Sequence, residues 1–508
     1  MSESIKNILI VGGGTSGWIT AAYLNRFLDP ARCSITLVES ATVGTIGVGE
    51  ATVPPLMPLL RALGINEDDF LRQCHATYKL GIKFVDWNRG AAGLQGKDEI
   101  WHPFGPIGAP VVNNLPLFHH WLRDRRAGVE SGTYTSYSLH VLLAEMGRAP
   151  RTLAEGSIVT RHGAYAYHLD AHAFADYLSG VATQRGVVRI TDDVRNVELD
   201  DRGFIRWVET EGHGRLAADL FIDCSGFSGL LIEKALGDDH IDWSNHLFCD
   251  RAVVLPTPRA AKMPPYTSAT ALSAGWAWKI PLHHRVGNGY VYSSRFISDE
   301  SAAHELVRHA GEDPSGASPM QLKMRVGRRE NFWMKNCVSV GLAAGFLEPL
   351  ESTGIYLAQT GVERLLDHFP DMQFNPALIA RYNATMGTEF AQVRDFIILH
   401  YLLNQRKDDG FWRANREAAP PDSLAQTLEF YDQTGLVDWN HAPLFTETSF
   451  YAIASGFGRL PRTYHPMADQ TDPALSRRTM AEIKTKNLEL ANSLPDHGAL
   501  IDAVNAAR

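Results

Sequence analysis

Residues 7–17 read Asn-Ile-Leu-Ile-Val-Gly-Gly-Gly-Thr-Ser-Gly, an apolar run followed at once by glycines in the order G-x-G-x-x-G. A short continuous apolar run is typical of a buried parallel strand. Residues 18–28 then predict a helix, and a second strand at 34–38 ends in Glu39. In such a unit the glycines allow the tight turn, the approach of a pyrophosphate and close helix packing, while the terminal acid hydrogen-bonds a ribose hydroxyl. We therefore predict an α/β Rossmann-like fold that binds a dinucleotide.

The identity of the dinucleotide is predicted from later stretches. Residues 47–54, Gly-Val-Gly-Glu-Ala-Thr-Val-Pro, form a second glycine-rich segment, which suits a long cofactor lying across the domain. Residues 168–178 predict a helix, residues 194–208 a β-hairpin, and residues 220–226 a late strand that ends in Asp-x-x-Gly. Each stretch alone also fits an ordinary strand or loop, but their order favours FAD. No second G-x-G-x-x-G follows a strand, so we expect no dedicated NAD(P)H domain.

Composition and charge argue against several classes of protein. The 508 residues are enough for a large core, and we expect two closely packed domains. The net charge of −9, without a long basic run, argues against a nucleic-acid partner. The five cysteines are scattered without a C-x-x-C pair, so neither a metal site nor a disulfide framework is indicated. No apolar run is long enough to span a bilayer and no room is left for a signal peptide, so we expect a cytoplasmic protein without membrane contact.

Residues 346–355, Phe-Leu-Glu-Pro-Leu-Glu-Ser-Thr-Gly-Ile, place two glutamates in a turn just before a predicted helix at 356–368. The backbone N–H groups of Ser352, Thr353 and Gly354 have no helical acceptor there, so they can face an anion. The alternative is a plain capping turn in which a serine or threonine side chain caps the helix. A carboxylate pair beside an anion-binding turn is the candidate for chemistry.

Two further stretches alternate as strands do. In residues 78–87 the alternation places Lys79 and Lys83 on one face and the apolar residues on the other. Solvation is the usual state of such lysines, but a flexible ammonium also suits the holding of an oxidised, electrophilic group. Trp276 and Trp278 share a face in the second stretch, where core packing is the alternative to a functional role.

Together these stretches resemble the flavin-dependent halogenases of the tryptophan halogenase family, from residue 7 to about residue 460. The motifs that carry the resemblance are Gly12-x-Gly14-x-x-Gly17, the 47–54 segment, Lys79 within Tyr-Lys-Leu-Gly-Ile-Lys-Phe, Gly275-Trp-x-Trp-x-Ile-Pro281, and Glu348-Pro-Leu-Glu-Ser-Thr-Gly354. The Trp-x-Trp-x-Ile-Pro motif separates this family from related monooxygenases. The implied fold is an FAD-binding Rossmann-like domain of the flavin monooxygenase type with a mostly helical C-terminal substrate region.

The resemblance also implies domains. We expect an FAD-binding and halide-oxidising domain at 1–365 and a mostly helical substrate-covering domain at 366–508. The tail from residue 477 to 508 predicts a solvated amphipathic helix, to which we assign no function.

The resemblance further implies a reaction and the roles of its residues. FADH2 and O2 convert chloride or bromide to hypohalous acid, which travels through the protein to a separate aromatic substrate. Lys79 holds or directs the oxidised halogen, and Glu351 supports the electrophile or removes the ring proton. The backbone N–H groups of Thr353 and Gly354 hold the halide, and the tryptophans keep the substrate away from the flavin. The residues implied to contact FAD are Gly12, Gly14, Thr15, Ser16, Gly17, Glu39, Gly49, Ala51, Val194, Leu347 and Ile355.

The resemblance implies partners as well. The reduced flavin would come from a separate NAD(P)H-dependent flavin reductase, in line with the missing NAD(P)H motif, and a homodimer is allowed. Two rival interpretations stay open. One is a flavin-dependent aromatic monooxygenase that hydroxylates its substrate and would not need Lys79. The other is a flavoprotein that binds FAD only to regulate or to carry it.

The expected substrate is a small indole-type compound. In halogenases of free tryptophan, a histidine and an aromatic side chain flank the indole ring; His102 and Phe104 stand in their place, and simple loop packing is the alternative. Those enzymes also clamp the amino acid's backbone with an aromatic-rich insertion. Here the matching segment, residues 435–445, is short, with only Trp439 and Phe445 aromatic. Because charged groups that lose water need replacement partners, we predict halogenation of indole in preference to free tryptophan.

Overall fold

The computed structural model describes residues 3–42, 49–89, 98–108, 114–153, 165–313, 316–407, 410–438 and 444–507. The chain forms two compact units of three segments each. Unit 1 comprises Met1–Ala76, Leu169–Asn245 and Met324–Gln392, and unit 2 comprises Thr77–His168, His246–Lys323 and Val393–Arg508. The units interleave along the chain and do not coincide with the halves 1–365 and 366–508, whose functional assignment stays a prediction.

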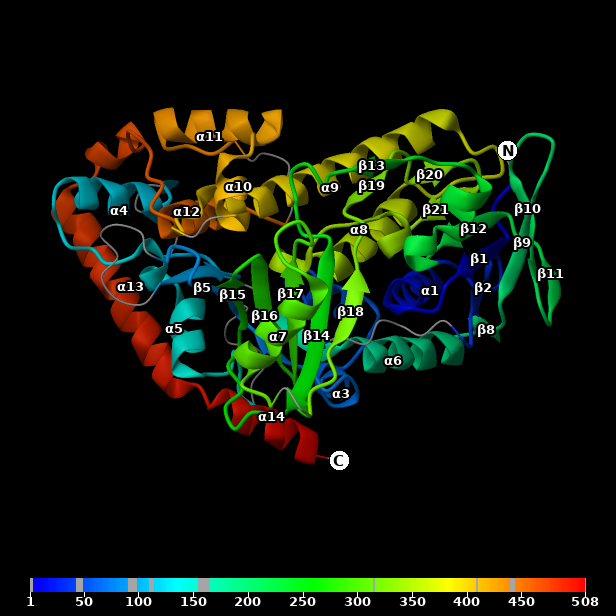
Figure 1. The fold of residues 1–508 in the computed structure, drawn as a ribbon, viewed down its shortest axis with the longest axis horizontal. Helices are drawn as coiled ribbons and strands as arrows, with labels where there is room; N and C mark the ends of the chain where they lie inside the picture. The colour runs from blue at the N-terminus through cyan, green and yellow to red at the C-terminus, as the bar shows by residue number, and fades with distance from the viewer. Residues whose placement is uncertain are drawn as a thin grey trace. The chain divides into compact units, whose positions relative to one another are not determined.

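Unit 1 is built on a six-stranded sheet in the order β20-β21-β12-β1-β2-β8 (Figure 1). Its strands are β1 (Asn7–Val11), β2 (Ser34–Glu39), β8 (Val188–Thr191), β12 (Leu220–Asp223), β20 (Trp333–Met334) and β21 (Cys337–Ser339). All neighbours are parallel except β20 and β21. The central strands are continuous apolar runs because both faces of the sheet are covered. The predicted Rossmann-like fold is therefore confirmed.

The two faces of this sheet are covered differently. Leu9 and Val11 of β1 share a core cluster with Ile205 and Val208 of the antiparallel sheet β11-β10-β9. Because side chains alternate, Ile8 and Ile10 face the other side, where helix α1 lies against β1 and packs with α6 and α8. These elements are β9 (Val194–Leu199), β10 (Ile205–Thr210), β11 (Gly214–Leu216), α1 (Thr15–Phe27), α6 (Ala171–Gln184) and α8 (Gly354–Asp367).

The remaining elements of unit 1 are short. They are β3 (Gly49–Ala51), α2 (Leu56–Ala62), α3 (Glu67–Gln73), a π-helix (Leu230–Ala235), β13 (His240–Asp242), β19 (Gly327–Arg329) and β22 (Gly345–Phe346). The hairpin expected at 194–208 is present as β9 and β10. The helix expected at 168–178 begins only at Ala171, because β7 extends to Asp170 and the Asp170 side chain caps α6 by accepting from the N–H groups of His172 and Ala173.

Unit 2 contains a seven-stranded sheet in the order β18-β14-β17-β16-β15-β5-β6, in which only the β15–β5 pair is parallel. Helix α7 packs on one face and shares a core cluster with Ala277 and Tyr290. A separate strand, β4, pairs antiparallel with β7. The strands are β4 (Thr77–Lys79), β5 (Gly81–Val85), β6 (Glu99–Pro103), β7 (Ala166–Asp170), β14 (Arg251–Pro258), β15 (Thr267–Leu272), β16 (Gly275–Pro281), β17 (Arg285–Tyr292) and β18 (Met320–Lys323).

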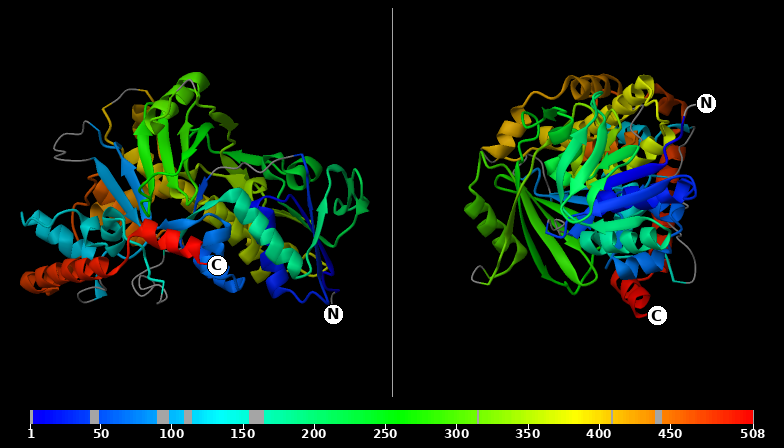
Figure 2. Two further views of the ribbon diagram at one scale, coloured as in Figure 1. Left: turned by 90° about the horizontal axis from the view of Figure 1, so that it is seen from below. Right: turned by 90° about the vertical axis from the view of Figure 1, so that its right-hand side faces the viewer.

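Helices make up the rest of unit 2. From Pro376 onward the described part of the chain contains helices and turns but no strand, which confirms the expected helical C-terminal region. Figure 2 shows α13 and α14, in red, running along unit 2. The helices are α4 (Leu117–Arg126), α5 (Leu139–Met146), α7 (Asp299–Ala310), α9 (Pro376–Leu403, which begins in unit 1), α10 (Phe411–Glu417), α11 (Asp422–Thr434), α12 (Glu447–Gly456), α13 (Pro473–Ser493) and α14 (His497–Ala506).

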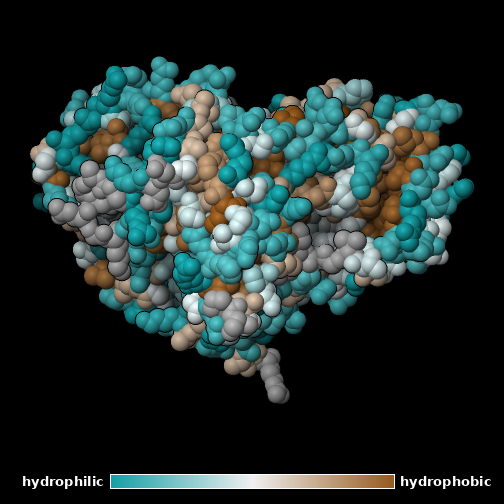
Figure 3. Space-filling model, viewed as in Figure 1, coloured by the Kyte–Doolittle hydropathy of each residue, from teal (hydrophilic) through white to brown (hydrophobic). Residues whose placement is uncertain are grey.

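Figure 3 shows the surface of the molecule from one side. On the face shown in Figure 3, hydrophilic residues cover most of the surface and hydrophobic ones gather in separate patches. Among the described residues, none of the helices has the length and apolar character needed to cross a membrane.

Candidate active site

The glycine turn after β1 has the geometry of a nucleotide-binding turn. Gly12 has a φ of 116°, and a Cβ there would lie 2.2 Å from the carbonyl oxygen of Cys224. A Cβ at Gly17 would lie 1.9 Å from the carbonyl oxygen of Gly12, so only glycine lets α1 start against the strand. At Gly14, in contrast, no described atom lies within 4 Å of the place of a Cβ. The first and third glycines are thus needed for packing, and the second leaves room for a pyrophosphate.

Glu39 ends β2, as predicted, and its carboxylate is oriented by two neighbours. Arg189 of β8 forms an ion pair with one oxygen, and Trp18 Nε1–H donates to the other over 3.2 Å. A carboxylate has about four acceptor positions, so both oxygens keep the capacity to accept from ribose hydroxyls. Arg189 was not identified from the sequence, because a lone arginine on a strand carries no local signal.

The Asp-x-x-Gly stretch after β12 organises its own loop. The Asp223 carboxylate is buried and accepts from the N–H and hydroxyl of Ser225 and from the N–H groups of Leu231 and Ile232. This fixes the entry to the π-helix. Of the other predicted cofactor contacts, Ala51 is buried in β3, Val194 packs against the core cluster of unit 1, and Gly47 and Val48 lie outside the described residues.

The two glutamates of the 346–355 turn are both fully buried. Glu348 and Glu351 have no exposed surface, and Leu347 and Ile355 at either end of the turn are buried as well. Residues Pro349–Glu351 form a 3₁₀ turn, which ends at Ser352 with a φ of 61°. Such a left-handed conformation is uncommon for a residue other than glycine and is concentrated at functional sites.

The capping alternative for this turn is met only in part. Thr353 is the N-cap of α8, but its side chain makes no capping hydrogen bond, and its buried hydroxyl has no hydrogen-bond partner among the residues that the structure describes. No acidic residue lies in the first turn of α8, and no described atom is within 4 Å of the place of a Cβ at Gly354. A helix N-terminus with donors, room and no carboxylate in its first turn is suited to an anion. We call the 12–17 turn, Glu39 and the 346–355 turn the nucleotide half-site.

In unit 2, Lys79 is fully buried at the end of β4. Its Nζ lies 4.8 Å from the centre of the Phe104 ring, a distance at which an ammonium is attracted to an aromatic face. Lys83 is different, because its Nζ forms an ion pair with Glu99 over 2.8 Å. The prediction that the two lysines share a face is wrong: the chain leaves the β4–β7 pair at Leu80 and enters the seven-stranded sheet as β5. Neither lysine is solvated as the alternative required.

Phe104 belongs to a wall of aromatic rings. His102 lies 5.9 Å from Phe104 and 5.3 Å from Phe396, measured between ring centres. Phe396 stacks on Phe445 with 4.0 Å between centres and 25° between planes. The predicted pair His102 and Phe104 is therefore brought together, next to Lys79. Phe396 and Phe445 were missed as site residues because they come from α9 and from the segment before α12, far away in sequence. Trp439 lies outside the described residues. We call Lys79, His102, Phe104, Phe396 and Phe445 the lysine half-site.

Trp276 and Trp278 share one face of β16, as predicted. Both are buried, with 6.2 Å between their ring centres, on the face opposite Ala277 and α7. The Trp278 ring lies against Gly289 of β17, where a Cβ would be 2.0 Å from Cζ2. The indole N–H of Trp278 is buried without a hydrogen-bond partner in the described part of the chain. Their packing is therefore tight, and a further role stays a prediction.

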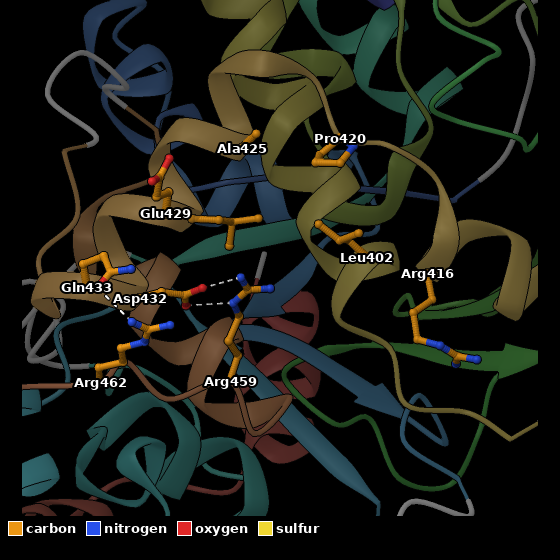
Figure 4. Close-up of a pocket in the computed structure, with 10 residues that line it drawn as sticks. Leu402, Arg416, Pro420, Ala425, Glu429, Asp432, Gln433, Arg459 and Arg462 are labelled. Atoms are coloured by element: carbon orange, nitrogen blue, oxygen red, sulfur yellow. Dashed lines mark hydrogen bonds and ion pairs between the residues drawn. The ribbon is translucent and has the colours of Figure 1, made fainter.

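A hollow of about 460 Å³ opens in unit 2 beside α10 and α11 (Figure 4). Arg459 forms a two-point pair with Asp432, with distances of 3.0 and 2.6 Å, and Arg462 donates to Gln433 over 3.3 Å. Arg416 donates to a backbone carbonyl over 2.8 Å. These three arginines already have partners and none of the predicted site residues lines the hollow, so we assign it no part in the site.

Comparisons with known proteins identify the family of the chain. The family model described as tryptophan halogenase matches residues 7–473. A tryptophan 7-halogenase from Lentzea aerocolonigenes is 38% identical over 526 residues, which cover 97% of this chain and 98% of the relative. A solved flavin-dependent halogenase from Brevundimonas sp. BAL3 is 40% identical, with a TM-score of 0.90 and 99% of each chain covered. One from Xanthomonas campestris is 38% identical, with a TM-score of 0.92 and 99% of each chain covered.

Proposed function

Because the chain belongs to the tryptophan halogenase family, a family of flavin-dependent halogenating enzymes, we propose that it halogenates an indole or a similarly electron-rich aromatic compound. Family membership favours halogenation over the hydroxylase alternative and over a flavoprotein without turnover. The observation that carries the proposal is the buried ammonium of Lys79 at the edge of the aromatic wall.

The nucleotide half-site fits FAD. The room at Gly14 accepts the pyrophosphate, Thr15 and Ser16 follow at the start of α1, and the oriented carboxylate of Glu39 accepts from the ribose. Leu347 and Ile355 supply apolar contact around the 346–355 turn. When reduced and bound, FAD supplies with O2 the oxidising power that turns a halide ion into hypohalous acid. A separate NAD(P)H-dependent reductase delivers the reduced flavin.

The halide, chloride or bromide, is held at the start of α8. The backbone N–H groups of Thr353 and Gly354 donate to it, and the positive end of the helix dipole adds attraction. The unpartnered hydroxyl of Thr353 is a further donor at this place. A helix N-terminus binds any small anion, so the turn does not select between the two halides by charge.

Lys79 and Glu351 carry the transfer. The Lys79 ammonium donates to the oxidised halogen species and directs its halogen toward the ring. A ring carbon forms a bond to the halogen while the halogen–oxygen bond breaks, and the hydroxide released takes up a proton from solvent to become water. The ring proton then leaves to the Glu351 carboxylate, which also stabilises the positive charge that develops on the ring.

The substrate lies against aromatic walls. His102, Phe104, Phe396 and Phe445 offer ring faces and edges that match a flat, apolar heterocycle. The amino and carboxylate groups of free tryptophan would lose water there, and an uncompensated charge costs several kcal/mol on burial. An indole without these groups avoids the cost.

A competition assay tests the proposal. The protein is supplied with a flavin reductase, FAD, NADH and bromide, and indole and free tryptophan are offered together and separately. We expect monobrominated indole by mass spectrometry, at its most electron-rich carbon, with a higher kcat/KM than for tryptophan. A higher kcat/KM for free tryptophan, with one regioisomer formed, would contradict the proposed substrate.

A further inference from the structure

The strand that presents Lys79 is completed by the C-terminal helix. β4 pairs with β7 on one edge, and in an antiparallel strand alternate N–H groups point to opposite edges. On the edge away from β7, the N–H of Leu80 donates to the carbonyl of Pro265 over 2.8 Å. The N–H of Tyr78 donates over 3.1 Å to Nε2 of His497, the first residue of α14. His497 thus takes the place of a neighbouring strand's carbonyl, one residue before Lys79.

The hydrogen bonds of His497 define its tautomer. Its Nδ1 lies 2.6 Å from the carbonyl oxygen of Met263, which can only accept, so Nδ1 carries the proton and Nε2 is the acceptor for Tyr78. Burial lowers the pKa of His497 to about 4, and the ring therefore stays neutral at ordinary pH. The ring is also fully buried, against the Tyr78 ring with 6.0 Å between centres.

The chain before His497 is fixed in place. The N–H of Ala149 donates to the carbonyl of Pro495 over 3.0 Å, and the N–H of His497 donates to the carbonyl of Gly147 over 2.8 Å. The exposed side chain of Asp496 caps α14 by accepting from the N–H of Ala499 over 2.9 Å. The tail that the sequence predicts as one solvated helix is thus two helices: α13 is mostly exposed, as predicted, whereas α14 is an anchored element with a buried side.

A second histidine holds the start of β4. Thr77 donates its hydroxyl proton to the carbonyl of Pro281 over 2.6 Å, so it accepts from Nδ1–H of His168 over 3.1 Å. Nε2 of His168 then accepts from the Thr267 hydroxyl over 2.9 Å. Burial, followed by the charge of Lys79, keeps the pKa of His168 well below its usual value. Neutral imidazoles thus hold the two residues before Lys79, His168 through the Thr77 side chain and His497 through the N–H of Tyr78.

We propose that His497 is a positioning residue for Lys79: through the N–H of Tyr78 it sets the edge of β4, so the C-terminal helix places the ammonium against Phe104 for halogen transfer. The proposal rests on the role of Lys79 given above. A shift of about 1 Å in a reacting group costs up to about 10²-fold in rate. Loss of the His497 acceptor should therefore slow the transfer of the halogen to the substrate more than the oxidation of halide.

The test measures how the oxidised halogen is divided between indole and a trap molecule in solution. The full-length protein receives reductase, FAD, NADH, bromide, indole and a water-soluble β-diketone that consumes hypobromous acid in solution. In His497→Phe, which keeps a ring but loses the acceptor, we expect the ratio of brominated indole to brominated trap to fall about tenfold, with total halide oxidised unchanged. His497→Gln restores the ratio, because its amide oxygen can accept from Tyr78.

His119 provides the matched control. It is buried in unit 2, its Nδ1 accepts from the N–H of His465 over 3.2 Å, and burial lowers its pKa to about 4 as well. His119→Phe should therefore lose stability without a change in the ratio. If His497→Phe does not fold, Asp496→Ala replaces it in the test. This variant removes the exposed N-cap of α14 and should lower the ratio of brominated indole to brominated trap about twofold. An unchanged ratio in folded His497→Phe or Asp496→Ala, or an equal fall in His119→Phe, would overturn the proposal.

A second readout needs no substrate. Amide hydrogen exchange of a peptide that contains Tyr78 should be faster in His497→Phe than in wild type and unaltered in His119→Phe. Equal exchange in His497→Phe and wild type would overturn the positioning role even if indole proves not to be the substrate. If the wild-type protein brominates only the trap, the proposed substrate is contradicted. The role of His497 is then decided by the hydrogen-exchange result alone.

Discussion

The nucleotide half-site of unit 1 is made from short continuous stretches, residues 12–17 and 346–355 with Glu39, each folded by its own turn chemistry. The lysine half-site of unit 2 draws its five residues from β4, the end of β6, α9 and the segment before α12. The first offers backbone donors and room, and the second offers one buried ammonium and aromatic faces.

We assign two separate chemical tasks to the two half-sites. Oxidation of a halide needs a fixed cofactor and an anion site. Backbone N–H groups in a turn can form the anion site whatever the neighbouring side chains are. Transfer to a ring needs walls that match a substrate, and these come from several elements whose side chains can vary independently. Glu351 is the exception in the nucleotide half-site, because the proposal assigns it to the transfer. For the other residues, we expect variants of the two half-sites to fail in different ways.

The largest effect is expected for Lys79→Ala. Removal of the ammonium should lower product formation by about 10³-fold or more, because the oxidised halogen loses its directing donor, while FAD affinity stays unchanged. Product is measured by mass spectrometry and FAD binding by fluorescence. Lys83→Ala is the control, since Lys83 is paired with Glu99 in another sheet and should keep its rate. Similar losses in both variants would argue that burial of a charge, not chemistry, explains the effect.

Glu351→Gln comes next. Loss of one charge-stabilising group at a reacting centre costs about 10²-fold in rate, so halogenation should slow by that factor with little change in FAD affinity. Glu348→Gln is the internal comparison, because both carboxylates are fully buried in the same turn. A crippled Glu348→Gln beside a nearly normal Glu351→Gln would reverse the assignment.

Acid should destabilise unit 2. Burial lowers the pKa of His119 and His497 to about 4, whereas an unfolded histidine titrates near 6.5. The unfolded state then binds protons that the folded state does not, so this stability is present above pH 6.5 and is lost as the pH falls toward 4. At pH 5 each such histidine should cost about 2 kcal/mol in the free energy of unfolding.

Urea unfolding at several pH values checks this expectation. His119→Phe is the variant to compare, because it lacks one of the two titrating histidines. Its free energy of unfolding should fall less steeply below pH 6.5 than that of wild type. Unit 1 contains one such histidine, His240, which is less buried than the two in unit 2. Burial lowers its pKa to about 4 as well. Parallel slopes for wild type and His119→Phe would show that this ring is protonated in the folded protein.

The smallest effect is expected for Gly14→Ala. The added methyl group meets no described atom, so the fold should be unchanged, but it occupies the room assigned to the pyrophosphate and should weaken FAD binding about tenfold, or about 1.4 kcal/mol. Gly180→Ala in α6 is the matched control, because its added methyl group also meets no described atom. FAD titration decides, and equal affinity for Gly14→Ala and wild type would place the pyrophosphate elsewhere.

The parts of the molecule that local chemistry determines were predictable. The apolar run of β1, the glycines after it and Glu39 lie where their spacing places them. Gly12 meets a steric demand from the neighbouring strand, and Gly17 meets one from the turn itself. The turn before α8 was likewise indicated by its own residues. The N–H of Ser352 donates to the carbonyl of Pro349, however, and the binding of an anion at Thr353 and Gly354 stays a prediction.

The parts that tertiary packing determines were not predictable. Lys79 and Lys83 lie in a stretch where polar and apolar residues alternate, but the chain passes from one sheet to another at Leu80. No local sequence pattern indicates that change. Phe396 and Phe445 meet because α9 and the segment before α12 pack together. His497 reaches β4 because bonds to Gly147, Ala149 and Met263, all distant in sequence, anchor the start of α14. An amphipathic pattern in the tail predicted a helix but not the partner of its buried side.

The separation of the two tasks is tested most directly by Lys79→Ala in the presence of the β-diketone trap and bromide, with reduced flavin supplied. The account predicts that this variant oxidises bromide at the wild-type rate and brominates the trap, while brominated indole disappears. A variant that brominates neither the trap nor indole would show that Lys79 takes part in halide oxidation itself, which would contradict the assignment of the two tasks to two half-sites.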